Sequence, residues 1–307
     1  MRLALVVLAL SALALAAPAG AATPARYVLP GDEVFPEGVA LRPGTDQFFV
    51  TSTQDGTVFR GRLGRPRTAV FLRPGSFGRT SANGIKATRD RLVIAGSVLN
   101  RIDVVDLRTG TAVRRFDTGS GGLINDIAIA PNGDAYATDS RRGVIFRIPA
   151  RQLRRRGGPV QLQPLVRVSP ALAPAGYTNG IVAAGPRYLL VCVTSNGFLL
   201  RVDLRTRQVT RVAVTGGDVP AADGMALRGR TLYVVNAGSR VSQLRVSPTL
   251  RSARVVREIR SPGFHLPTTV AIAGRRLLVV NSQFDRRSAG LPPLLPFTVS
   301  SVPRPRS

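Results

Sequence analysis

Four oxygen-bearing residues at matching positions of a repeated phrase are the best candidates for chemistry in this chain. They are Glu37, Asn125, Asn179 and Asp223. Two carboxylates near one axis repel each other unless a cation lies between them, and together with two amide oxygens they offer four hard ligands. This set suits a divalent cation, with calcium favoured and zinc or magnesium as alternatives. Zinc is less expected without imidazole or thiolate ligands.

The phrase that contains these residues returns six times. Its first residues are 46, 42, 54, 44 and 45 positions apart, a period typical of four-stranded propeller blades. Each phrase is followed by a turn and a run rich in β-branched and aromatic residues, such as residues 47–50, which predicts strands. The six phrases are Glu37-Gly38-Val39, Asn83-Gly84-Ile85, Asn125-Asp126-Ile127, Asn179-Gly180-Ile181, Asp223-Gly224-Met225 and Thr268-Thr269-Val270.

The repeat predicts an all-β fold, a six-bladed β-propeller with four antiparallel strands per blade. The first strand of every blade lines the central channel, so equivalent positions converge on one axis. The last blade lacks a fourth strand in the sequence, whereas residues 23–31 resemble one. Gly31 precedes Glu37 by the interval that separates Gly217 from Asp223. We therefore expect the N-terminal strand to close the ring and remove two exposed sheet edges.

The N-terminus predicts export. Arg2 is followed by an apolar run over residues 3–16 and by small residues at 18–22, a pattern typical of a cleaved signal peptide over residues 1–22. The apolar run is shorter than the roughly 20 residues of a spanning helix, so no transmembrane segment is expected. We expect a secreted, extracellular protein in which residues 23–307 form a single domain.

The distribution of charge indicates which classes of partner are expected, and the single cysteine has a separate interpretation. The net charge of +26 comes almost wholly from arginines spread over every repeat, with one dense cluster at residues 151–156. Nucleic-acid binding would concentrate the arginines on one element beside aromatic residues, so no nucleic-acid partner is expected. The basic surface is either simply solvated or associates weakly with an anionic envelope surface. The single cysteine, Cys192, lies in an apolar run and is predicted to be a small buried hydrophobe.

The motifs Pro36-Glu37-Gly38-Val39, Asn125-Asp126, Asn179-Gly180 and Asp223-Gly224-Met225 resemble the metal motifs of the senescence marker protein (regucalcin) and gluconolactonase family of six-bladed propellers. Their order is also similar to that in paraoxonases and the squid-type diisopropyl fluorophosphatase, which are calcium- or zinc-dependent hydrolases of lactones and organophosphates. The resemblance implies that Glu37, Asn179 and Asp223 bind the metal, and that Asn125 completes the shell or touches substrate. It further implies that Asp223 is the catalytic base or nucleophile.

Two departures from that resemblance concern the substrate. Leu123 stands where gluconolactonase-like enzymes carry a sugar-binding arginine, and the paraoxonase histidine pair is absent. The one histidine, His265, precedes Thr268 by three residues and either has a structural role or contacts substrate. Redox enzymes that collect several imidazoles around a metal are excluded. Asn83 and Thr268 are expected to complete the channel wall as neutral substrate-binding groups.

The function expected from these residues is a metal-dependent hydrolase of the lactonase or esterase type, which acts on a small molecule such as a lactone or ester. The alternative is a non-catalytic propeller in which the ion pins the inner strands and the loops bind an envelope component or a protein. A strictosidine-synthase-like condensing enzyme ranks lower, because its chemistry needs a catalytic glutamate and Glu37 is assigned to the metal. Propellers host all of these functions, so the fold does not decide between them.

Overall fold

The computed structural model of the chain describes residues 25–173 and 177–306 and is built almost wholly from β-strands. The helices within these residues are short: α1 (Ala150–Arg154), α2 (Phe284–Ser288) and a 3-10 turn over Ser76–Gly78. None of them has the length and apolar character that crossing a bilayer requires. The predicted signal peptide, residues 1–22, lies outside the described residues.

Antiparallel pairing groups the strands into runs of four. The first runs are β2 (Pro36–Leu41), β3 (Gln47–Ser52), β4 (Val58–Arg62) and β5 (Arg65–Leu72), then β6 (Ile85–Ala87), β7 (Arg91–Ala95), β8 (Arg101–Asp106) and β9 (Ala112–Asp117). The next are β10 (Ile124–Ile129), β11 (Ala135–Asp139), β12 (Val144–Ile148) and β14 (Pro164–Arg167), then β15 (Thr178–Ala184), β16 (Tyr188–Val193), β17 (Phe198–Asp203) and β18 (Val209–Thr215). The last are β19 (Ala222–Arg228), β20 (Thr231–Asn236), β21 (Arg240–Val246) and β22 (Ser252–Arg260), then β23 (Pro267–Ala273), β24 (Arg276–Asn281), β25 (Thr298–Pro303) and β1 (Ala25–Val28).

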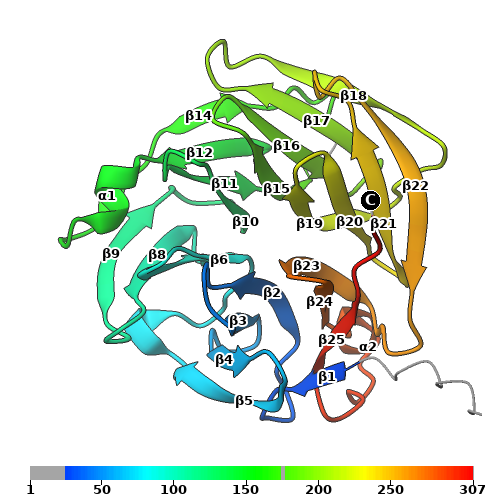
Figure 1. The fold of residues 1–307 in the computed structure, drawn as a ribbon. Coiled ribbons are helices and arrows are strands. Elements are labelled where there is room, and N and C mark those ends of the chain that lie inside the picture. The colour runs from blue at the N-terminus through cyan, green and yellow to red at the C-terminus, as the bar shows by residue number, and fades with distance from the viewer. Residues whose placement is uncertain (1–24, 174–176, 307) are drawn as a thin grey trace, which may run out of the picture.

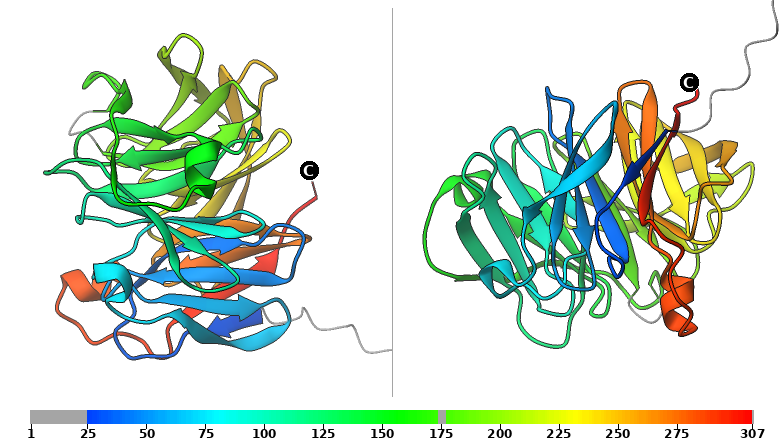
Figure 2. Two further views of the ribbon diagram at one scale, coloured as in Figure 1. Left: turned by 90° about the vertical axis from the view of Figure 1, so that its left-hand side faces the viewer. Right: turned by 90° about the horizontal axis from the view of Figure 1, so that it is seen from below.

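The runs stand side by side around a central axis, as in a β-propeller (Figures 1 and 2). The strands nearest the axis are β2, β6, β10, β15, β19 and β23, which we call the inner strands (Figure 1). Each inner strand contacts the next one around the ring, and β23 contacts β2, so the circle is closed. Every repeated phrase lies at or just before the start of an inner strand, which brings the phrases to one end of the axis.

The N-terminal strand completes the sheet that contains the C-terminal one, as the sequence predicts. Strand β1 pairs antiparallel with β25, from Ala25 opposite Ser301 to Val28 opposite Thr298. Val28 also pairs in parallel with Arg67 on β5, so β1 links the last sheet to the first. The two ends of the described chain are therefore joined by backbone hydrogen bonds, and no free sheet edge remains between them.

One predicted strand is divided in the structure. The sequence predicts a single fourth strand over residues 160–168, but only Pro164–Arg167 pairs with β12. The preceding β13 (Val160–Gln161) pairs in parallel with β9 of the neighbouring run. The chain thus crosses from one sheet to the next within a few residues, and Leu162 packs in the core between them.

Hydrophobic clusters between neighbouring sheets hold the ring together. Successive residues of a strand point to opposite faces, and both faces are buried when a sheet has neighbours on each side. Phe48 and Phe49 on β3 show the pattern, since both are fully buried in different clusters. Phe48 packs with Tyr27 and Phe297 from the two chain ends, whereas Phe49 packs with residues of β6 and β7. The apolar runs in the sequence therefore become the contacts between sheets.

Candidate functional site

A β-bulge sets the position of the phrase residues on five of the inner strands. The pairing register shifts between Pro36 and Val39 on β2, and at the matching points of β10, β15, β19 and β23. The first two residues of the phrase therefore stand opposite a single residue of the second strand. A bulge of this kind bends the strand and redirects its side chains. In the remaining unit, Asn83 and Gly84 precede β6.

Strained backbone precedes three of the phrases. Phe35, Ala221 and Leu266 have positive φ angles of 41°, 47° and 47°, and each lies two residues before a phrase, those that begin with Glu37, Asp223 and Thr268. Non-glycine residues rarely adopt this conformation, which persists where the surrounding structure enforces it. The strain therefore recurs at equivalent points beside the two acidic candidates.

The glycines of the phrases allow neighbouring inner strands to approach closely. A Cβ atom on Gly38 would lie 2.6 Å from the carbonyl oxygen of Asn83, and one on Gly180 would lie 2.3 Å from that of Asp223. Any side chain at these positions would collide with the adjacent backbone. The second residue of one phrase thus lies against the backbone of the first residue of the next.

Side-chain hydrogen bonds from the second strands hold the phrase backbone in place. In each case an alcohol or thiol donates to the carbonyl of the first phrase residue in the next unit. The pairs are Thr51 to Asn83 at 2.5 Å, Thr138 to Asn179 at 2.7 Å and Cys192 to Asp223 at 2.8 Å. Cys192 is a small buried residue in a strand, as predicted, and its thiol in addition takes the place of the threonine hydroxyl of the other units.

Buried oxygens without partners mark three of the four predicted metal ligands. Glu37 Oε2, Asn125 Oδ1 and Asn179 Oδ1 have no hydrogen-bond donor among the described residues. The two amides are oriented through their nitrogens, because Asn125 Nδ2 donates to Ser140 Oγ and Asn179 Nδ2 donates to Thr194 Oγ1, both at 2.9 Å. Each amide oxygen is thereby left available. Buried oxygens normally have a partner, so these three could bind a cation.

The acidic candidates interact with one another electrostatically. Burial raises the pKa of Glu37 well above its ordinary value, and the negative charges of Asp223 and Asp126 raise it further. Burial of the carboxyl group and the charge of Asp126 raise the pKa of Asp223 to about 8, although Asn179 and the Gly224 N–H partly oppose the shift. A bound cation would remove the cost of ionising both groups.

The donor set fits a hard divalent cation. Among the described residues, no group of three or more histidine, cysteine, aspartate and glutamate side chains is placed to hold a metal ion. A site at the axis therefore depends on the two amide oxygens as well as on Glu37 and Asp223. All of these ligands are oxygens, which suit calcium or magnesium better than zinc.

An ion pair at the axis was not singled out from the sequence. Lys86 Nζ lies 3.0 Å from Asp126 Oδ1, and the Asp126 side chain is 3% exposed. Asp126 also accepts hydrogen bonds from the backbone N–H groups of Ile127 at 2.7 Å and Ile181 at 3.1 Å. Two signals could have pointed to this pair. Asp126 stands where four other phrases have glycine, and Lys86 is the one lysine among 43 basic residues.

The predicted substrate-binding residues differ in their burial and in their hydrogen-bond partners. The Thr268 hydroxyl donates to the backbone carbonyl of Glu37 at 3.1 Å, so it closes the ring of inner strands. His265 is half-buried, and its hydrogen bonds in the described structure involve its backbone, to Asn281 and Gln283. Asn83 is half-buried beside Gly38. Thr268 thus has a structural partner, and the substrate-binding roles of Asn83, Asn125, Thr268 and His265 stay predictions.

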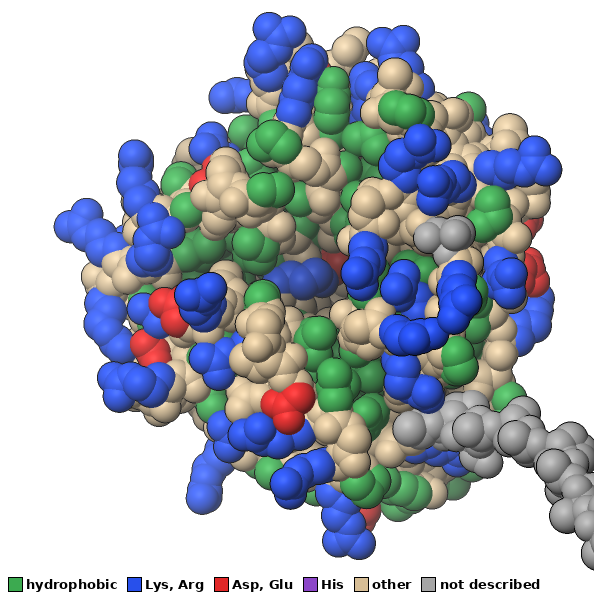
Figure 3. All heavy atoms as spheres, viewed as in Figure 1, with side chains coloured by type: hydrophobic (Ala, Val, Ile, Leu, Met, Phe, Trp, Pro, Cys, Tyr) green, Lys and Arg blue, Asp and Glu red, His purple; other side chains and the backbone are tan. Residues whose placement is uncertain are grey.

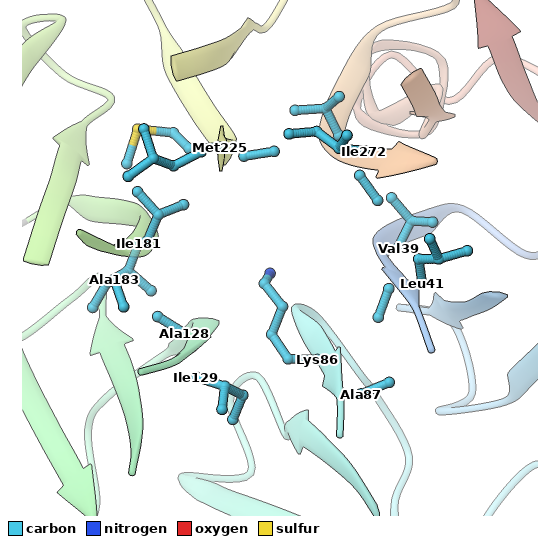
Figure 4. Close-up of a pocket in the computed structure, with 16 residues that line it drawn as sticks. Val39, Leu41, Lys86, Ala87, Ala128, Ile129, Ile181, Ala183, Met225 and Ile272 are labelled. Carbon is cyan, nitrogen blue, oxygen red and sulfur yellow. The ribbon is translucent and has the colours of Figure 1, made fainter. Parts of the chain in front are cut away.

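A cavity opens at the other end of the inner strands. Its volume is about 270 Å³, and its walls come from all six inner strands. In Figure 3 a hollow lies at the centre of this face with a basic side chain at its floor, and Figure 4 shows Lys86 pointing into the ring. The axis therefore has a polar end, with the first residues of the phrases, and an aliphatic end, and the Lys86–Asp126 ion pair lies between them.

Solved structures resemble this fold over most of its length. A virginiamycin B lyase from Staphylococcus aureus has 10% identity and a TM-score of 0.60, and the match covers 91% of this chain and 98% of that one. A structure named "putative gluconolactonase" has 15% identity and a TM-score of 0.65 over 93% of each chain. U3-55K has 9% identity and a TM-score of 0.65 over 91% and 98%.

Identities this low show a shared fold, so the chain has a β-propeller fold like that of the lyase and the gluconolactonase-named protein. No protein-family model and no curated protein matches the sequence.

Proposed function

We propose that this protein is a secreted hydrolase of the lactonase or esterase type, built on a six-bladed propeller formed by residues 23–307, with a divalent cation at the axis. Each antiparallel run of four strands is one blade in this proposal. The observation that carries it is the set of partnerless buried oxygens on Glu37, Asn125 and Asn179. These residues begin equivalent phrases on separate inner strands, beside a carboxyl group on Asp223 that is costly to ionise without a cation.

The proposed division of labour follows from the contacts of each residue. Glu37, Asn125, Asn179 and Asp223 hold the cation, with calcium favoured and magnesium or zinc as alternatives. When bound, it polarises a carbonyl or phosphoryl oxygen of the substrate and orients water. We assign proton transfer or attack to Asp223, whose buried carboxylate a bound cation would keep ionised. Asn83, Asn125 and His265 are the candidate substrate contacts.

Two further parts of the proposal rest on sequence. Residues 1–22 direct secretion, and the arginine-rich surface supports weak association with anionic envelope polymers. Figure 3 shows basic side chains spread over one whole face rather than gathered in one groove, which favours a diffuse interaction. No nucleic-acid partner is proposed.

A substrate screen tests the hydrolase. The calcium-loaded wild-type protein is assayed against lactones, aryl esters and organophosphates, beside a metal-only blank and the variant Asp223→Asn. We expect turnover of at least one class, and a loss of about 100-fold or more in kcat for Asp223→Asn with the fold retained. No turnover above the blank by a folded, calcium-loaded wild type would reject the hydrolase.

The second candidate is a propeller in which the cation is structural and the loops bind a partner. The hydrogen bond from Thr268 to the Glu37 carbonyl favours it, because a residue expected to face substrate instead joins two inner strands. Calcium would then raise stability without any hydrolysis. The screen above, combined with a calcium-dependent melting curve, separates the two functions.

A further inference from the structure

The cavity at the aliphatic end of the axis has the properties of a binding site. Its accessible apolar wall includes Leu41, Ile129 and Ile272, which are half-buried. These three residues lie around one central opening (Figure 4). Ile181 and Met225 lie deeper, each at most 1% exposed, and pack in the clusters between sheets. Engineered aliphatic cavities of about 150 Å³ bind ligands the size of benzene, so about 270 Å³ can hold a longer chain.

Lys86 adds a charged group to the centre of this aliphatic ring. Its ammonium carries three hydrogen-bond donors, and among the described residues its one acceptor is Asp126 Oδ1 at 3.0 Å. The other two donors of Nζ form no hydrogen bond within the described residues. Figure 4 shows the nitrogen at the open centre of the ring, and the Lys86 side chain is 22% exposed. A ligand that places an oxygen beside Nζ would satisfy these donors.

Lys86 is not the only group that stabilises the negative charge of Asp126, so its ammonium can also interact with a second anion. Two backbone N–H groups, those of Ile127 and Ile181, also stabilise the Asp126 carboxylate. The molecule as a whole carries a net charge of +26, which attracts anions to its surface. An anionic head group beside Lys86 would therefore gain a charge-assisted hydrogen bond, the stronger kind.

We propose that this cavity is a second ligand site, separate from the cation site, for a small amphipathic carboxylate with an unbranched aliphatic chain. The chain lies among Leu41, Ile129 and Ile272, and the carboxylate accepts hydrogen bonds from Lys86 Nζ. The proposal needs neither a bound cation nor hydrolysis, because none of these four residues is a proposed metal ligand.

Octanoate and methionine NMR provide a direct test. The sequence has two methionines, and Met225 lines the cavity, so selective ¹³C-methyl labelling of the full-length chain places a reporter at the site. EDTA is present throughout, which makes the result independent of the cation site. We expect octanoate to shift the Met225 methyl signal saturably, and octanol to bind about tenfold more weakly because it lacks the charge.

Variants locate the binding. Lys86→Leu should weaken octanoate binding by about tenfold or more, and Ile272→Glu should do the same by placing a negative charge on the rim. Val98→Glu is the matched control, since Val98 is 48% exposed and does not line the cavity. If Lys86→Leu does not fold, the Ile272→Glu and Val98→Glu pair decides. The proposal fails if the methyl signal does not move, if octanol binds as tightly as octanoate, or if both rim and control variants behave alike.

Discussion

The Thr268 hydroxyl donates a hydrogen bond of 3.1 Å to the carbonyl oxygen of Glu37, 231 residues earlier in the chain. Both residues are buried, at 2% and 4% exposure. The bond joins β23 to β2, the last inner strand to the first, at the residue proposed to supply the glutamate ligand. This one hydrogen bond therefore both closes the ring of inner strands and holds the backbone of a proposed cation ligand.

Thr268→Val tests this contact. Valine keeps the shape of threonine but leaves the buried Glu37 carbonyl without this donor, which should lower the free energy of unfolding by about 1–3 kcal/mol. Thr45→Val is the control, because its hydroxyl bonds the Arg42 carbonyl at an exposed turn and its loss should cost under about 0.5 kcal/mol. Urea unfolding measures both, and equal effects would show that the closure bond adds no stability.

Tyr27→Ala tests closure by β1. Tyr27 is 4% exposed, and its ring meets that of Phe48 edge-on at 4.8 Å. Truncation of a buried aromatic side chain should destabilise the protein by about 3–5 kcal/mol. Val70→Ala, at a site 47% exposed, should change stability by less than about 0.5 kcal/mol. A melting temperature that is unchanged in Tyr27→Ala would mean that β1 does not support the ring.

Calcium should raise the melting temperature of the wild type, with a shift that grows with calcium concentration. Glu37→Gln removes one of the two ligand charges and should abolish most of this shift. The matched control is Glu33→Gln, which makes the same change on an exposed residue four positions earlier. A calcium response of Glu37→Gln equal to that of Glu33→Gln would place the ion elsewhere.

Cation affinity should increase with pH. Burial raises the pKa of Asp223 to about 8 and that of Glu37 in the same direction, so without a cation Asp223 is largely protonated at neutral pH. Binding then releases protons, and affinity should rise by up to about tenfold per pH unit for each proton released, with the contribution of Asp223 levelling off above pH 8. Calorimetry in buffers of different ionisation enthalpy counts the protons, and an affinity independent of pH would contradict the assignment.

The same shifts predict the stability of the cation-free protein. Between the ordinary aspartate pKa near 4 and the folded value of about 8, the folded state holds a proton at Asp223 that the unfolded state has lost. The free energy of unfolding should therefore fall as pH rises through this window. Urea unfolding in EDTA, compared between wild type and Asp223→Asn, should show a smaller pH dependence in the variant.

Cys192 provides a test based on the repeat. The equivalent residues Thr51 and Thr138 make the same hydrogen bond to a phrase carbonyl, so Cys192→Thr should retain the contact to Asp223. Cys192→Val has nearly the same shape and removes the donor, which should cost about 1–3 kcal/mol more than the threonine variant. Unfolding curves that coincide would show that the thiol acts as a hydrophobe, as the sequence predicted.

The period of the phrases was enough to predict the order of the strands and the role of the N-terminal segment. Alternating apolar runs identify strands without reference to distant parts of the chain, and a missing strand at one end calls for a spare strand at the other. The pairing of β1 with β25 follows from that argument. The division of residues 160–168 between two sheets did not, because the strand that each piece pairs with lies far from it in the sequence or in another sheet.

The geometry of the candidate site depends on contacts between distant residues, which the spacing of the phrases in the sequence does not reveal. Thr268 was expected to face substrate, but only the folded ring shows that its hydroxyl reaches Glu37. Lys86 and Asp126 are 40 residues apart, and a single sequence does not show that adjacent inner strands bring their side chains together. The orientation of the Asn125 and Asn179 amides likewise comes from hydroxyl groups on the second strands.

The pairing of β1 with β25 also determines when the N-terminal strand can fold during synthesis. The first described strand to leave the ribosome, residues 25–28, must wait for residues 298–303 before it has its antiparallel partner. A nascent or truncated chain that stops before residue 298 leaves β24 with an unpaired edge and Tyr27 without its partner strand. An incomplete chain therefore has an exposed sheet edge that the finished protein lacks, and this edge makes it prone to proteolysis and aggregation.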